Sequence, residues 1–164
     1  MKLTARKAIL LSGLLWLAIG ILLLYKGISY LSLAGHGVMS GTHQGFSLIK
    51  KLTEFTKNPQ QSSLIVICAG LLIGLFKGRV VFKKTVDRVT LRIRSQKEPI
   101  ALSKIYSPGY VVLILGMMGL GMVFKYLPIP LDVKGLLDFA IGFALINGAM
   151  LYFRAAATSP TKAS

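Results

Sequence analysis

Residues 69–94 read AGLLIGLFKGRVVFKKTVDRVTLRIR and carry the features on which the fold depends. The segment begins as an apolar helix with Gly70, Gly74 and Gly78 at every fourth position, and it turns basic at Lys77. Two overlapping GxxxG motifs are typical of membrane helices that pack closely, because small residues let two backbones approach in lipid. The segment therefore predicts a helix-packing face, and its basic half indicates the orientation of the chain in the membrane.

The chain contains four apolar runs that are too long for the strands of a soluble domain. Only Asp138 interrupts these runs with a charge. A helix that crosses a bilayer needs about 20 mostly apolar residues, and flanking lysine or arginine side chains can snorkel to the interface. The sequence predicts an all-α integral membrane protein with a single membrane domain, residues 1–164. The expected spans are residues 8–28, 63–82, 109–127 and 135–154.

The net charge of +15 is divided unevenly between the segments that connect the spans. Fourteen of the 20 basic residues lie near the N-terminus, in the 77–108 connection or near the C-terminus. Cytoplasmic segments carry the excess of lysine and arginine in membrane proteins. We therefore expect both termini, the basic 77–108 connection and a short tail at 155–164 to be cytoplasmic, with the bacterial inner membrane as the default compartment.

The first external connection contains two different kinds of sequence. Residues 35–45 are rich in glycine and read as irregular. His36 and His43 lie in this segment without an acidic or thiol neighbour, so no metal site is expected. Residues 46–55 instead predict a short amphipathic helix that lies on the membrane surface or caps the bundle, and Asn58-Pro59 ends it.

Two local structures fit residues 83–95. Phe82, Val86 and Ile93 fall on one helical stripe, and no glycine or proline intervenes before Pro99. Residues 88–94, however, alternate polar and apolar residues strictly and include β-branched ones, as a strand does. The helical continuation of the second span is favoured, and the strand remains the alternative.

An internal repeat relates the two halves of the chain. Shifting the second span by 70 residues superposes its small residues on those of the fourth span. The pairs are Gly70 with Ala140, Gly74 with Ala144, and Gly78 with Gly148. A shift of 99 residues places Gly20 on Gly119 and Lys26 on Lys125. This duplication predicts two tandem helical hairpins related by an axis along the membrane normal, with the second and fourth spans as the close-packing pair.

Three polar residues are candidates for a polar lining. Lys77 follows Gly70 by seven residues and is expected on the packing face, and Asn147 is its partner in the repeat. Asp138 lies one turn inside the fourth span, with Lys125 as its expected partner. Polar groups inside a span are functional candidates, but a snorkelling lysine and a carboxylate near a helix N-terminus are the structural alternatives.

Signatures of enzymes, cofactor sites and metal sites are lacking, so the sequence favours a non-catalytic structural, assembly or interaction role without cofactors. The alternative is a small transporter or channel subunit built from the repeat. Besides the bilayer, the expected partners are anionic lipid headgroups and a second copy or another membrane protein. Nucleic acid is not expected, because the basic segment lacks interleaved aromatic residues. The expected contacts to lipid or partner are Arg79, Lys83, Lys84, Arg88, Arg92 and Arg94.

Overall fold

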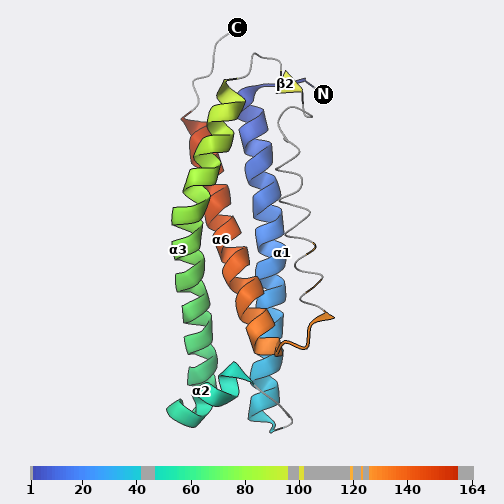
Figure 1. Cartoon of the computed structure of the whole chain (residues 1–164), viewed down its shortest axis with the longest axis vertical. Helices are drawn as coiled ribbons and strands as arrows, with labels where there is room; N and C mark the ends of the chain where they lie inside the picture. The colour runs from blue at the N-terminus through green and yellow to red at the C-terminus, as the bar shows by residue number, and fades with distance from the viewer. Residues whose placement is uncertain are drawn as a thin grey trace.

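Helices make up almost all of the structure, a computed structural model that describes residues 2–41, 47–95, 100–101, 119, 123 and 126–158. Figure 1 shows α1 (Ala5–Met39), α3 (Pro59–Arg94) and α6 (Leu131–Ala157) side by side, with the short α2 (Leu48–Thr56) at one end of the bundle. At the other end, β1 (Lys2–Leu3) and β2 (Ile100–Ala101) form a two-residue antiparallel pairing.

The helix α6 packs against both α1 and α3, whereas α1 and α3 contact each other less. Gly13 and Gly27 of α1 face Phe153 and Phe139 of α6, respectively, so these two helices are antiparallel. Along α3, later glycines face later residues of α6, so α3 and α6 run in the same direction (Figure 1). The start of α1 therefore lies at the same end of the bundle as the ends of α3 and α6.

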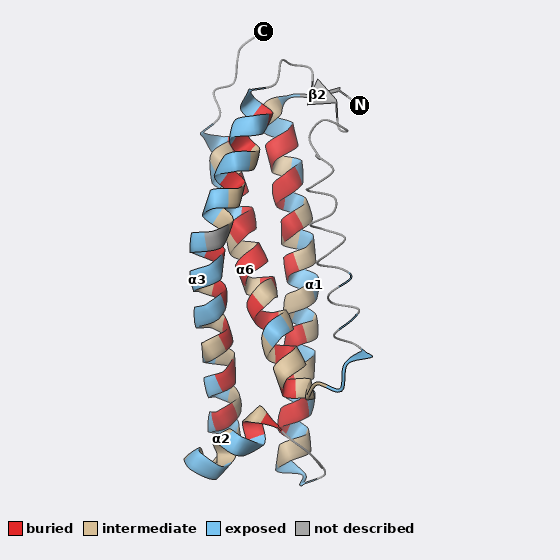
Figure 2. Ribbon diagram, in the orientation of Figure 1, coloured by how far each residue is buried: buried red, intermediate tan, exposed pale blue. Residues whose placement is uncertain are grey.

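The bundle has the surface of a membrane protein. Among the described residues, α1, α3 and α6 are long and apolar enough to cross a membrane. Figure 2 shows buried residues on the sides that face one another and exposed residues on the outer sides. Large apolar side chains such as Leu22, Leu72 and Phe76 point outward, as lipid-facing residues do. The all-helical membrane class expected from the sequence is confirmed.

The first helix extends further than the expected span and includes His36. The expectation of irregular backbone is wrong for residues 35–39, which are helical. Leu31 and Ala34 are buried in a cluster with Ile49 of α2, and this packing holds the helix together despite its glycines. The His36 ring nitrogen Nδ1 also lies 2.8 Å from the Ser32 carbonyl oxygen one turn earlier.

Residues 83–94 continue α3 as a helix, so the helical alternative is confirmed and the strand is wrong. Val86, Thr90 and Ile93 are buried on one side of this half of α3. Val86 and Ile93 belong to a cluster with Ile9 and Tyr152, on α1 and α6. Packing of this buried side against α1 and α6 explains why residues 83–94 form a helix and not a strand. The first part of the expected basic connection is consequently a rigid extension of the second span.

Several expectations concern residues outside the described ranges. Apart from Gly119, Val123 and residues 126–127, the expected third span falls on such residues. His43, Lys125 and the end of the C-terminal tail also lie outside the described ranges.

Asp132 joins α2 to the beginning of α6. Its side chain is 0% exposed, and its Oδ2 accepts hydrogen bonds from Ser47 Oγ at 2.8 Å and from the Ile49 backbone N–H at 2.9 Å. Its Oδ1 accepts from the Val133 backbone N–H at 2.9 Å. A carboxylate at the first turns of two helices satisfies N–H groups that have no partner within their own helix. One buried acid thereby fixes α2 across the end of the bundle.

Replacing Asp132 with alanine should destabilise the protein by about 1–3 kcal/mol, because Ser47 and the Ile49 N–H would lose their buried acceptor. Asp132→Asn should cost less, since one side-chain oxygen remains. The free energy of unfolding in detergent micelles measures both effects. The exposed acid Glu54 on α2 supplies the matched control, Glu54→Ala. Equal losses from Asp132→Ala and Glu54→Ala would contradict the role assigned to Asp132.

Candidate functional site

The closest helix contact is a seam of small residues between α1 and α6. Small residues recur at seven-residue intervals on both helices. They are Gly13, Gly20, Gly27 and Ala34 on α1, and Gly135, Gly142, Ala149 and Ala156 on α6. A Cβ added to Gly27 would lie 2.4 Å from the Phe139 backbone nitrogen, and one on Gly142 would lie 2.6 Å from the Leu24 nitrogen. Neither glycine has room for a side chain.

This seam corrects the expectation that the second and fourth spans form the closest pair. On α3, the tightest corresponding distance is 2.8 Å, between a Cβ added to Gly74 and the Ala140 carbonyl oxygen. The sequence prediction used the four-residue glycine motif of α3 and not the seven-residue spacing of small residues on α1 and α6. A period of 3.5 residues per turn is the signal of a left-handed helix pair, and it was present in the sequence.

The predicted packing residues of α3 and α6 do face each other, displaced by one helical turn. Gly74 faces Ala140, and a Cβ on Gly78 would lie 3.1 Å from the Ala144 carbonyl oxygen. A Cβ on Gly148 would lie 2.9 Å from the Phe82 ring, whereas one on Gly70 would approach the Phe139 ring. Residues that the 70-residue shift aligns in sequence are thus displaced by one helical turn from the residues that they contact.

An ion pair links α1 and α6 inside the apolar part of both helices. Lys26 Nζ lies 3.5 Å from Asp138 Oδ2, and the Asp138 side chain is 14% exposed. The Lys26 ammonium also lies 5.5 Å from the centre of the Tyr30 ring. The expected partner, Lys125, is outside the described residues, and sequence reasoning missed Lys26. Its position beside Gly27 on the α6-facing side of α1 was the available signal.

Among the described residues, no hydrogen bond joins Lys77 to Asn147. Lys77 is exposed, which corrects its expected place on the packing face. The buried glycines of α3 recur every four residues, whereas an α-helix has 3.6 residues per turn. The line of buried residues therefore winds around the helix, and at Gly78 it is no longer on the same side as Lys77. Asn147 is partly buried, and its Nδ2 donates to the Phe143 carbonyl oxygen of its own helix at 2.9 Å. Each residue has a local structural explanation.

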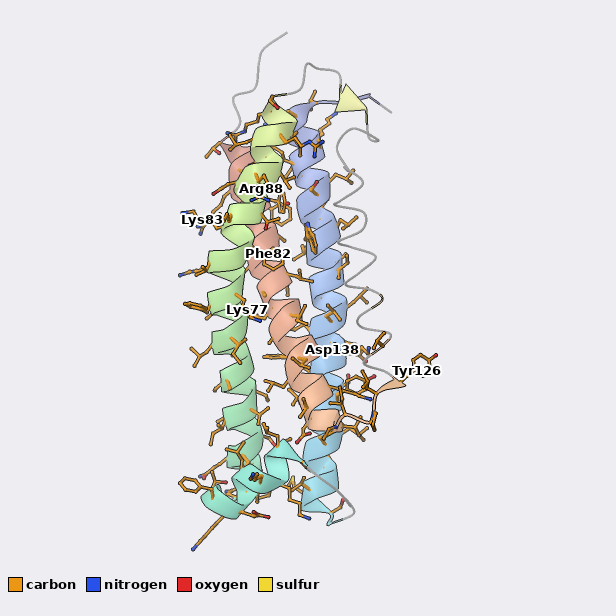
Figure 3. The ribbon with its side chains drawn as sticks, in the orientation of Figure 1. Lys77, Phe82, Lys83, Arg88, Tyr126 and Asp138 are labelled. Atoms are coloured by element: carbon orange, nitrogen blue, oxygen red, sulfur yellow. The ribbon has the colours of Figure 1, made fainter. Side chains whose placement is uncertain are left out.

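The predicted basic contacts form an exposed surface on the second half of α3. Arg79, Lys83, Lys84, Arg88, Arg92 and Arg94 are all exposed. Figure 3 shows Lys83 pointing away from the other two helices. Arg94 Nη2 also donates to the Ala155 carbonyl oxygen at 2.9 Å, which connects the end of α3 to α6. Arg6, Lys7 and Arg154 are exposed near the same end of the bundle, which is therefore strongly positive.

The contact between Trp16 and Phe82 sets the register of α3. Their rings are 5.8 Å apart at 78°, an edge-to-face arrangement, and Trp16 is 2% exposed. Trp16 lies at the middle of the charge-free run 8–25, whereas Phe82 lies between Arg79 and Lys83. The basic part of α3 consequently lies beside the apolar part of α1.

No protein-family model matches this chain, and no curated protein or solved structure was found to be similar to it. Within the described ranges, no three His, Cys, Asp or Glu side chains gather as metal ligands do. The seams, the Lys26–Asp138 pair and the basic face of α3 are therefore the features on which a function can be argued.

Gly27→Ala should destabilise the protein by about 1–3 kcal/mol, because the added methyl group collides with the α6 backbone. In an ordinary helix interior the same change stabilises by up to about 1 kcal/mol, so the sign of the effect is diagnostic. Unfolding in detergent micelles measures it. The control, Ala18→Leu on the exposed side of α1, should be nearly neutral. A stabilising Gly27→Ala would contradict the seam.

Proposed function

We propose that this chain is a non-catalytic multi-pass membrane protein with a structural or assembly role. The observation that carries the proposal is the packing of α6. Added Cβ atoms at Gly27, Gly142 and Gly74 would lie within 2.8 Å of neighbouring backbone atoms, so α6 is held tightly by both of its neighbours. Such seams make a rigid support and leave little space for a solute to pass along α6.

We further propose four spans in two tandem hairpins, with both termini in the cytoplasm of a bacterium. The parallel direction of α3 and α6 supports this arrangement, because the chain must cross back between two spans that run the same way. It also agrees with a duplication in which both hairpins have the same orientation. The excess of basic residues near the start of α1 and the ends of α3 and α6 supports the cytoplasmic assignment.

We propose that the membrane-embedded part of α3 is the expected span, residues 63–82. Phe82 contacts Trp16, so the end of this span lies beside the middle of the charge-free run 8–25 of α1. We propose that Lys77 and Arg79 snorkel to the headgroup layer and contact anionic lipids there.

A small transporter or channel subunit is the alternative, and the Lys26–Asp138 pair is the observation that favours it. Ionisable residues inside a membrane mark ion or proton pathways more often than they serve packing alone. The pair joins α1 and α6 close to Gly27, however, where the two backbones are in closest contact. That position suits a link between two helices, so the structural role is the better supported one.

Single cysteines test the topology. In a Cys68→Ala background, Ser40→Cys at the end of α1 and Ser95→Cys after α3 should react with impermeant thiol reagents from opposite sides of the membrane. Both positions are exposed and lie at opposite ends of the bundle. Labelling of both from the same side would refute the proposed arrangement.

Neutral replacement of the ion pair distinguishes the two functions. Lys26→Met alone should lower the unfolding free energy, because Asp138 loses its partner, and the double variant Lys26→Met/Asp138→Leu should restore much of it. A structural protein tolerates the double variant and leaves vesicles sealed to protons. A proton leak in vesicles that contain the native protein, lost in the double variant, would favour the transporter. A pH-sensitive dye trapped in the vesicles reports it.

A further inference from the structure

The short helix α2 contacts the bundle at the level where three proposed spans end. Ile49 of α2 is buried in one cluster with Leu31 of α1, and its backbone N–H donates to Asp132 at the start of α6. At the other end of α2, Thr56 Oγ1 and Ser62 Oγ of α3 lie 2.7 Å apart. The contacted residues of α1, α3 and α6 each lie within three residues of the end of a proposed span.

This level corresponds to the headgroup layer of a membrane. Three helical residues extend about 4.5 Å along the helix axis. The headgroup layer adds about 5–8 Å to each side of the hydrocarbon core. The helix α2 lies across the end of the bundle, so it falls within this layer (Figure 1). This depth rests on the proposed spans, but it is the same for either orientation of the chain in the membrane.

An apolar stripe of α2 extends beyond the bundle at this depth. Leu48, Leu52 and Phe55 occupy positions i, i+4 and i+7 and share one helical face. Leu48 and Leu52 are partly buried against the bundle, whereas Phe55 is 90% exposed. Lys50 and Glu54 are exposed on the opposite side of α2. The described part of the chain thus leaves one phenyl ring exposed at the depth of the headgroups.

Hydrogen bonds at both ends of α2 hold the helix in this rotation. The Asp132 carboxylate accepts from the Ile49 N–H in the first turn, and Thr53 Oγ1 lies 3.1 Å from Ser62 Oγ further along. Rotation of α2 would break these hydrogen bonds and would expose Ile49, which is 0% exposed. Phe55 therefore keeps its exposed position.

Lipid is the environment that fits a phenyl ring in this position. A short amphipathic helix in the membrane plane places its apolar side chains at the boundary between headgroups and acyl chains, and its lysine side chains reach the phosphates. Lys51 and Lys57 are exposed on either side of Phe55 in the sequence. A water-soluble partner would have to displace headgroups before it reached the ring. We propose that Phe55 inserts into the lipid interface and anchors α2 in the membrane surface.

The test uses tryptophan as a depth probe in the full-length protein in nanodiscs. Trp16 is the only tryptophan, so Trp16→Phe/Phe55→Trp contains a single fluorophore. Lipids brominated near the headgroup end of the acyl chain should quench its fluorescence strongly, and iodide in the water should quench it weakly. The matched variant Trp16→Phe/Glu54→Trp changes the neighbouring residue on the other side of α2. Its emission should lie at longer wavelength, and iodide should quench it more strongly than the brominated lipids do.

A third variant, Trp16→Phe/Leu72→Trp, tests the span itself, because Leu72 is exposed within the apolar half of α3. Lipids brominated near the chain end should quench this fluorophore most. If they do, but iodide and not bromine quenches Phe55→Trp, the anchor is overturned while the proposed span stands. A Phe55→Trp fluorophore that neither quencher reaches also overturns the anchor, because a protein surface then covers the ring. Absence of bromine quenching at both positions overturns the anchor together with the span.

Circular dichroism checks that each variant keeps its helices. If Trp16→Phe loses them, a polarity-sensitive thiol probe on Cys68→Ala/Phe55→Cys gives the same comparison, with Cys68→Ala/Glu54→Cys as its control. Both faces of a nanodisc are accessible, so these outcomes do not depend on the cysteine labelling that tests topology.

Discussion

The close contact of α1 and α6 at Gly27 is the constraint on which the rest of the bundle depends. In lipid, apolar side chains gain nothing by leaving their surroundings, so helices associate through dense contact between backbones. Phe139 leaves no room for a Cβ on Gly27, and this fixes both the separation and the register of the pair. The same contact places Lys26 next to Asp138 and turns Ala140 and Ala144 toward α3.

The helix α3 combines an apolar half and a basic half in one continuous element. Its first half packs through Gly70, Gly74 and Gly78, and its second half packs through larger residues such as Phe82 and Val86. The exposed side changes from apolar to basic at Lys77, while the buried side stays continuous along the whole length. A change in the position of the apolar half would thus be transmitted mechanically to the basic half.

The sequence allowed good prediction of the features that local pattern controls. The long apolar runs, the break at Asn58-Pro59 and the helical stripe through Val86 all depend on spacing along one segment. The remaining features depend on segments far apart in the chain. His36 is helical because of contacts between helices, and Lys26 pairs with a residue 112 positions away. Asp132 accepts hydrogen bonds from Ser47 and Ile49 at the start of α2. Spacing within one segment contains no information about such partners, although the seven-residue recurrence of glycine on α1 and α6 could have indicated which helices meet.

The hydrogen bonds of Asp132 have a consequence for the order of events during synthesis. Its partner Ile49 precedes it by 83 residues, so the ribosome completes α2 well before the acceptor of its first turn exists. At about 5–20 residues per second, that interval lasts several seconds. During it, the Lys50 N–H can already donate to Ser47 Oγ, but the Ile49 N–H lacks its acceptor and bonds to water or lipid headgroups. The bonds between α2 and the start of α6 therefore form only after Asp132 has been synthesised.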